Sequence, residues 1–394
     1  TDLNNIQGKH MKLTVNKEQI IEGLQKAAAI IPAKAGAAYL RSIWLKAEEG
    51  SLAVMSTDAN IEFTGRYPAE VSQPGLIGVQ GRAFVDLVRQ LPTGVLNLTL
   101  DEASGNLLLE QGRRVYKLPV SGSEWFQNFS EFPVENAVTW SGDFLQDVLD
   151  KVAFCISDDD AMDAIACLCM KPGENGHIDV CGLNGHQFAL VSFTHDDLAV
   201  RLPAEGMLIQ KKYLQDIKKW LGADEIELNI TDKRLYLRSL DGAETLSLPR
   251  AAYEYPDYNI FMGKLADEGV NSMTLDRKEG MDALGRILIF NTESDRCTYM
   301  DLSENEARLS AQGQDVGSAS ESLEVAYKGD IARIAFPTRN LLDVLGHFVS
   351  AKIDMLLTGT EGPCGIRGPE DPDYTVIIMP MKVSETTYYS EEDV

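Results

Sequence analysis

Hydrophobic and polar positions along the chain follow two periods, and the same succession of periods occurs three times. Each copy begins with apolar positions spaced three and four apart and ends with alternating apolar and polar positions. The first period is typical of an amphipathic helix and the second of a half-buried strand. Asp86, Asp216 and Asp343 occupy the same place in the three copies and are almost evenly spaced along the chain. The three segments are residues 81–100, 210–230 and 337–357.

A second set of amphipathic helices supports the same repeat. Glu22, Asp147 and Asp282 occupy corresponding positions in these helices and are again almost evenly spaced. Each repeat therefore contains two helices in the same order and at similar spacing. The six predicted helices cover residues 16–28, 81–91, 141–156, 210–222, 276–290 and 337–349.

Between the helices, the sequence predicts short strands joined by turns such as Asp241-Gly242. Sequential hairpins with only two helices per repeat favour an antiparallel α+β fold over a parallel sheet. We therefore predict three repeated domains, each built from antiparallel sheet and two helices. The predicted segments are a vector-derived leader at 1–10, domains at 11–135, 136–264 and 265–383, and an acidic tail at 384–394.

The third predicted domain ends in an apolar run, "YTVIIMPMKV" at residues 374–383. A continuous apolar run is typical of a strand that is buried on both faces. Pro380 cannot donate to a strand ladder, so it belongs at a sheet edge or a strand end. Met379 and Met381 suit a surface that adapts to several partners. Two interpretations are open: a core strand, or an edge strand whose side chains form the floor of an apolar binding groove.

The sequence carries no motif for a catalytic or cofactor site. It lacks phosphate-binding and dinucleotide-binding glycine loops, nucleophile elbows and zinc-binding helices. The six cysteines lie mostly in apolar runs, which favours buried reduced thiols over disulfides or zinc. The acidic stretch "SDDDAMD" at 157–163 permits two interpretations, a magnesium site or a solvated loop. The solvated loop is favoured, because the carboxylates are consecutive and no phosphate-binding loop accompanies them. We predict a protein that is not an enzyme and has no metal or cofactor.

Charge is unevenly distributed along the chain, whose formal net charge is −24. The six predicted helices hold 13 basic and 11 acidic residues, whereas the rest of the chain holds 23 and 49. Lys211, Lys212, Lys218 and Lys219 all lie in one helix. Such a run is either a solvated face or part of a basic surface for phosphate, because local charge attracts phosphate. The sequence shows neither an apolar stretch of about 18 residues nor a signal peptide, so we expect a cytoplasmic protein without membrane contact.

Several stretches resemble the bacterial sliding clamps, the β subunits of the replicative DNA polymerase III. The resemblance spans residues 11–383, and its most specific pieces are the closing apolar strand and the turn "NGHQF". It implies a head-to-tail homodimer whose six domains form a ring, with helices lining a hole for duplex DNA. The stretches are "MKLTVNKEQIIEGLQK" from Met11, "STDANIEF" at 56–63, "GLNGHQFALVSF" at 182–193, "YPDYNIF" at 255–261 and "YTVIIMPMKV".

The same resemblance implies a function without catalysis. A clamp encircles double-stranded DNA without reading its sequence and tethers the polymerase for processivity. The polymerase III α subunit, the clamp loader, other polymerases and repair proteins bind through short linear motifs in a cleft between the second and third domains. The repeat alone also permits a different class of protein, an interaction scaffold that never touches DNA.

The resemblance favours the second interpretation of the closing apolar run, an edge strand whose side chains form the floor of a groove for short linear peptides. It also implies particular site residues. Those at cleft positions are Ile165, Leu183, Gly185, His186, Phe188, Pro256, Phe261, Pro363, Ile377, Met379, Pro380, Met381 and Val383. Among the cleft positions that differ from the usual types are Leu183, Gln187 and Ile260, in a region where a threonine and two arginines are common.

Other implied sites lie outside the cleft. Lys34 matches a basic loop position, which adds it to the four helix lysines as a candidate DNA contact. The loop at Asp159 is acidic where the family often carries an uncharged polar contact. The implied dimer seam pairs one subunit with an edge strand of the other, through Ile289 and Phe290 on one side and Tyr116 and Leu118 on the other.

Overall fold

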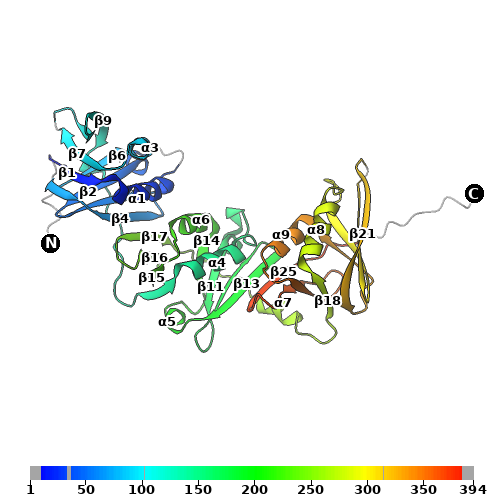
Figure 1. The fold of residues 1–394 in the computed structure, drawn as a ribbon. Helices are drawn as coiled ribbons and strands as arrows, with labels where there is room; N and C mark the ends of the chain where they lie inside the picture. The colour runs from blue at the N-terminus through cyan, green and yellow to red at the C-terminus, as the bar shows by residue number, and fades with distance from the viewer. Residues whose placement is uncertain (1–9, 33–36, 102, 314, 384–394) are drawn as a thin grey trace, which may run out of the picture. The chain divides into compact units, whose positions relative to one another are not determined.

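The computed structural model describes residues 10–32, 37–101, 103–313 and 315–383, and these residues form two compact units (Figure 1). The first unit contains the described residues up to Leu149 together with Lys212–Ala251. The second contains Asp150–Lys211 and the described residues from Ala252 onward. The second predicted domain thus contributes to both units, and the three-domain division remains a prediction.

The first unit is built on one antiparallel sheet of 13 strands. In sheet order the strands are β10 (Val138–Ser141), β15 (Glu225–Ile230), β16 (Arg234–Ser239), β17 (Glu244–Pro249), β4 (Glu62–Pro68), β3 (Ser51–Thr57), β2 (Ser42–Glu48), β6 (Gly75–Gln80), β9 (Arg114–Ser121), β8 (Asn106–Gln111), β7 (Val95–Asp101), β1 (Lys12–Asn16) and β5 (Glu70–Gln73).

The second unit is built on an antiparallel sheet of 12 strands. In sheet order they are β14 (Met207–Gln210), β11 (Cys167–Pro172), β12 (His177–Leu183), β13 (Gln187–Thr194), β25 (Tyr374–Ile378), β24 (Cys364–Arg367), β23 (Lys352–Leu357), β18 (Asn271–Asp276), β21 (Gly317–Lys328), β20 (Glu306–Gly313), β19 (Cys297–Ser303) and β22 (Arg333–Pro337). The predicted antiparallel α+β architecture is confirmed.

All six predicted helices are present, and their ends lie within one turn of the predicted bounds. They are α1 (Lys17–Ile30), α3 (Gly81–Gln90), α4 (Gly142–Ala153), α6 (Lys211–Trp220), α8 (Arg277–Leu288) and α9 (Thr338–Gly346). The pattern did not predict the short helices, because a single turn carries too little periodicity. These are α2 (Ala38–Arg41), α5 (Asp196–Ala199) and α7 (Asn259–Lys264). None of the helices in the described residues is long and apolar enough to cross a membrane.

Helices α1, α3, α8 and α9 each lie against strands of their own unit. In α1 the buried positions include Ile20, Leu24 and Ala27, which lie on one face at helical spacing. Helices α8 and α9 lie side by side in the second unit (Figure 1). The six cysteines are free and buried, which confirms the prediction of buried reduced thiols. Burial raises the pKa of the Cys155 and Cys364 thiols, so they remain protonated.

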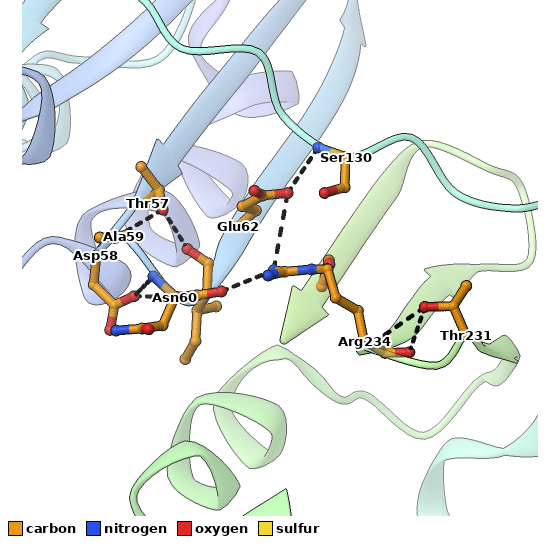
Figure 2. A network of polar contacts seen from close by, with 10 residues as sticks. Thr57, Asp58, Ala59, Asn60, Glu62, Ser130, Thr231 and Arg234 are labelled. Atoms are coloured by element: carbon orange, nitrogen blue, oxygen red, sulfur yellow. Dashed lines mark hydrogen bonds and ion pairs between the residues drawn. The ribbon is translucent and has the colours of Figure 1, made fainter. Parts of the chain in front are cut away.

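The sheet of the first unit runs across the predicted boundary near residue 135. Strand β17 pairs with β4, with Leu246 opposite Phe63. A polar network beside this pairing joins the same segments (Figure 2). Arg234 donates to the Asn60 carbonyl at 2.8 Å, and its guanidinium lies 3.9 Å from the Glu62 carboxylate, which accepts from the Ser130 amide at 2.7 Å. The "STDANIEF" stretch therefore ties the first predicted domain to strand β16.

Candidate functional site

An apolar groove of about 280 Å³ lies at the end of strand β25 in the second unit. Its walls come from the β12–β13 hairpin, helix α7, the end of the β23–β24 turn and the residues around the end of β25. The lining residues are Leu183, Gly185, His186, Gln187, Phe188, Ile260, Phe261, Lys264, Pro363, Ile377 and Met379. The fold thus brings together ten of the residues that occupy predicted cleft positions, although their role in peptide binding remains a prediction.

The β12–β13 turn and its register set one side of the groove. Gly185 has a φ of 88°, a left-handed conformation that glycine adopts without strain. The Asn184 side-chain oxygen accepts a hydrogen bond from the backbone N–H of Gln187 at 2.9 Å, which holds the turn closed. Strand β13 then pairs with β25, and Phe188 lies opposite Ile377. Because facing residues of paired strands project to the same side, these two side chains form a continuous apolar surface.

Helix α7 forms another wall of the groove. Leu265 follows α7 directly and packs against Gly365 of β24, where an added Cβ would lie 2.6 Å from a Leu265 methyl carbon. Glycine at this position therefore allows the helix to approach the sheet closely. The Phe261 ring meets Phe188 edge to face, with ring centroids 4.9 Å apart.

Tyr258 anchors the start of α7 to the sheet. Its ring stacks on Phe188 at 5.4 Å, and its hydroxyl donates to Asp179 Oδ2 at 2.8 Å. Burial, followed by the hydrogen bond to this carboxylate, raises the pKa of Tyr258. Asp179 also accepts from the Ser192 hydroxyl at 2.6 Å. The aromatic wall of the groove is thus held by the Tyr258 hydroxyl donor and the Asp179 side-chain acceptor on strand β12.

A second hollow, of about 680 Å³, lies beside the chain that follows β25. Met379 and His186 line both hollows, and the Met379 amide donates to the His186 carbonyl at 2.9 Å. The Met381 amide donates to the Ala335 carbonyl of β22 at 2.8 Å. The other lining residues are Glu293, Ser294, Asp295, Arg296, Cys297, Tyr299, Pro337, Asn340, Ile378, Pro380, Met381 and Lys382.

The prediction of an edge strand at the closing apolar run is wrong. Strand β25 lies between β13 and β24, and its five residues, Tyr374–Ile378, are all buried. An interior position explains the uninterrupted apolar run, because both faces of the strand are covered. Pro380 follows the strand end and therefore removes no hydrogen bond from the ladder. Met379 and the half-exposed Met381 also lie beyond the strand, so β25 contributes Ile377 to the groove floor.

Three predicted cleft residues line neither hollow. Ile165 is half-buried in the 3₁₀ segment Asp160–Ala166, Pro256 is exposed before α7, and Val383 is half-buried at the end of the described chain. Sequence reasoning missed Lys264, which lines the groove at the end of α7. Lys264 lies one helical turn after Ile260. A sequence prediction of helix α7 would therefore have placed both side chains on the same face.

Four of the candidate DNA-contacting lysines lie on α6. Lys211 donates to the Ile156 carbonyl at 2.8 Å and to Asp158 at 2.6 Å, so its ammonium group already has two acceptors. Lys212 and Lys219 are exposed on the helix, whereas Lys218 is half-buried. The fifth candidate, Lys34, lies outside the described residues. DNA contact by these lysines remains a prediction.

The acidic stretch 157–163 forms a short capped segment. Asp158 bonds to Lys211, and the Asp159 carboxylate accepts from the Ala161 amide at 3.0 Å and caps the 3₁₀ turn. Within the described ranges, no group of three or more acidic, cysteine or histidine side chains is placed to hold a metal ion. In the described part of this loop, Asp158 therefore forms an ion pair and Asp159 caps the 3₁₀ turn.

Each unit carries a strand edge to which no described strand is paired. In β9, residues 114–119 pair only with β8, and the half-buried Tyr116 and Leu118 alternate with exposed residues. In β21, residues 317–324 pair only with β20. Unpaired edges expose backbone donors and acceptors that can add another strand. The sequence indicated the first edge but not the second.

Ile289 and Phe290 lie near the β21 edge. Arg286, in the last turn of α8, forms a bidentate ion pair with Glu321 of β21 at 2.7 and 3.0 Å. The Phe290 carbonyl lies beside Gly313, where the β20–β21 hairpin begins. Ile289 is 70% exposed, so an apolar side chain is available next to this edge. The participation of Ile289 and Phe290 in the dimer seam remains a prediction.

Comparison with solved structures defines the class of fold. The DNA polymerase sliding clamp from Caulobacter crescentus has a TM-score of 0.87 and 23% identity, covering 95% of this chain and all of that one. The chain therefore has the sliding clamp fold.

Sequence comparison gives the family. A model of the DNA polymerase III beta subunit N-terminal domain matches residues 11–130, and one of the C-terminal domain matches residues 265–382. The beta sliding clamps of Caulobacter vibrioides (strain NA1000) and Escherichia coli (strain K12) are 23% and 22% identical, each over 95% of this chain and 100% of the relative. The chain belongs to the DNA polymerase III beta subunit family.

Proposed function

We propose that this protein is a non-catalytic processivity factor that closes as a head-to-tail homodimer around double-stranded DNA. The observation that supports it most directly is the alignment with sliding clamps over 95% of the chain, which includes both matched domains. A protein that acts on the bacterial chromosome works in the cytoplasm, where we place it.

Of the unpaired strand edges, those of β9 and β21 are the proposed contacts between subunits. The β9 edge of one subunit pairs with the β21 edge of the other, and the same contact occurs twice in the ring. The edges carry opposite charge, with the exposed Arg114 and Lys117 on β9 and the exposed Glu324 on β21, whereas Glu321 is already paired with Arg286. Ile289 and Phe290 add apolar area next to Tyr116 and Leu118. Charge complementarity and a heterologous contact together favour the head-to-tail orientation.

DNA is held by position in the ring rather than by base recognition. Lys34, Lys212, Lys218 and Lys219 contact phosphates, which makes the interaction sequence-independent and salt-sensitive. Lys211 contributes less, because Asp158 and the Ile156 carbonyl already satisfy its ammonium group.

The apolar groove binds short linear motifs of partner proteins. Its apolar walls suit apolar peptide anchors, and Met379 supplies an adaptable side chain between the two hollows. The proposed partners are the polymerase III α subunit, the clamp loader, other polymerases and repair proteins. Competition among them for one groove follows from this assignment.

Retention on circular DNA tests whether the protein forms a closed ring around the duplex. Protein that a bacterial clamp loader and ATP have placed on a primed, circular plasmid is expected to stay bound through gel filtration in high salt. Cutting the plasmid once should release it, because the link is topological. Equal dissociation from circular and linear DNA would contradict the ring and favour the alternative, an interaction scaffold without topological DNA contact.

Replacing Met379 by alanine tests whether the groove binds peptides. A fluorescent peptide of the Gln-x-x-Leu-Phe type is expected to bind Met379→Ala more weakly by about 1–3 kcal/mol, because an anchor contact is lost. Val349→Ala serves as the control, since Val349 is 70% exposed in the same unit and lines neither hollow. Unchanged affinity in Met379→Ala, measured by titration, would place the peptide elsewhere.

A further inference from the structure

Asp158 and Lys211 form an ion pair at the start of the acidic loop 157–163. Lys211 Nζ donates to Asp158 Oδ1 at 2.6 Å and to the Ile156 carbonyl at 2.8 Å. These two acceptors leave one of the three N–H donors of the ammonium group. The Lys211 side chain is 24% exposed, whereas that of Asp158 is 92% exposed. The ion pair is therefore open to solvent on the side of the carboxylate.

Backbone contacts hold the loop in position for this ion pair. The Ser157 amide, directly before Asp158, donates to the carbonyls of Ile165 at 3.1 Å and Leu183 at 3.3 Å. An exposed ion pair usually contributes little, partly because two flexible side chains must be immobilised. Here a backbone carbonyl also holds Lys211, and Asp158 has a short side chain on an anchored segment. Forming the pair therefore costs less conformational entropy than it would between two long, free side chains.

The Asp158 carboxylate offers Lys211 the same kind of partner as a DNA phosphate. Both groups present an anionic oxygen that accepts a charge-assisted hydrogen bond from an ammonium group. Because the carboxylate is exposed, a phosphate can replace it without entering the protein interior. The negative charge beside Lys211 also lowers the local positive potential that would attract phosphate. Asp158 and a phosphate therefore compete for one ammonium group.

We propose that Asp158 is a positioning residue for DNA contact, which holds the Lys211 ammonium group in place of a phosphate and thereby weakens DNA binding. This inference rests on the proposed function, in which the lysines of α6 face DNA. A phosphate reaches Lys211 only by displacing Asp158, so the contact contributes less than it would with a free lysine. A ring that is retained by topology needs no tight phosphate contacts, and weaker contacts let it move along the duplex.

Asp158→Asn tests the proposal, since asparagine has nearly the same shape as aspartate but no charge. Fluorescence anisotropy with a linear duplex over a series of salt concentrations measures the affinity. We expect this variant to bind roughly fivefold more tightly at low salt, the size typical of one exposed ion pair. The slope of log affinity against log salt should steepen by roughly one, because one more phosphate contact releases a counterion. Asp158→Glu keeps the carboxylate and should behave like the wild type.

Two further variants separate the ion pair from the general loss of negative charge. Asp163→Asn removes the same charge from the same loop, and Asp163 is exposed and is not an acceptor for Lys211. Asparagine tolerates the left-handed backbone at this position, where φ is 49°. Asp163→Asn should change the affinity and the salt slope much less than Asp158→Asn. In a Lys211→Gln background, Asp158→Asn should lose its effect on the salt slope, because that effect acts through the lysine.

The outcomes distinguish this inference from the proposed function. Equal affinity and salt slope in the wild type and Asp158→Asn would overturn the inference and leave the clamp function intact. An equal gain in Asp158→Asn and Asp163→Asn would also overturn it, because net charge alone would then explain the result. Weaker binding together with a lower thermal midpoint in Asp158→Asn would assign the residue a structural role instead. A wild type that neither binds the duplex at low salt nor stays on circular DNA would overturn both.

Discussion

Replacing Ile289 by aspartate is expected to convert the dimer into monomers at concentrations where the unchanged protein is dimeric. Ile289 is 70% exposed, so a charge there leaves the fold of the subunit intact. In the proposed seam, the same side chain is buried against Tyr116 and Leu118, where an unpaired carboxylate is costly. We expect the dimer dissociation constant to rise roughly 100-fold, about 2.7 kcal/mol. Sedimentation velocity over a dilution series measures it.

Val200→Asp provides the control for this experiment. Val200 is 75% exposed, follows the short helix α5 and belongs to the same unit as Ile289. An aspartate there adds the same charge away from the β21 edge, so the dimer should persist. If Ile289→Asp and Val200→Asp dissociate alike, the seam does not involve Ile289. If neither dissociates, the strand edges meet some other surface.

Replacing Asp371 by alanine is expected to destabilise the second unit strongly. Asp371 is 3% exposed and accepts from the Val349 amide at 3.1 Å, the Ser350 amide at 2.9 Å and the Ser350 hydroxyl at 2.5 Å. These bonds hold the turn after α9 against the chain that enters β25. Removing the carboxylate leaves buried donors unpaired, which lowers the free energy of unfolding by about 3 kcal/mol.

Calorimetry should detect this loss as a shift of one unfolding transition. For a unit of this size, a loss of about 3 kcal/mol lowers the midpoint by roughly 6–12 °C. Glu361→Ala is the comparison, because Glu361 is exposed and its nearest cation, Lys382, lies 4.0 Å away. Glu361→Ala should change the free energy of unfolding by no more than about 0.5 kcal/mol. A similar midpoint in both variants would show that the Asp371 network contributes little.

The groove shows how a site can be assembled from residues that are far apart in sequence. Phe188 and Ile377 meet through the pairing of β13 with β25, while α7 adds Phe261 from a third segment. The resemblance to clamps named these positions individually. It did not predict that the Gln187 side chain would be buried beside Asn184, because this pairing depends on the turn geometry.

Two assignments depended on contacts that no periodicity encodes. Lys211 sits in a basic helix stretch, yet its ammonium group bonds to Asp158 and to the Ile156 carbonyl, which come from a loop that is distant in sequence. The closing apolar run was expected at a sheet edge because of Pro380, but β24 and β13 cover both edges of β25. In each case a neighbour from a distant segment decided the environment.

The sequence by itself determined the six long helices, the antiparallel strands between them and their threefold repetition. Spacing along the chain shows which face of an element is apolar, and that face is a local property. Only the tertiary structure decided which strands pair across the predicted boundaries, as β17 does with β4 and β13 with β25. Strand pairing depends on complementary packing between segments that are far apart in the chain, and many apolar strands of similar length satisfy the same local pattern.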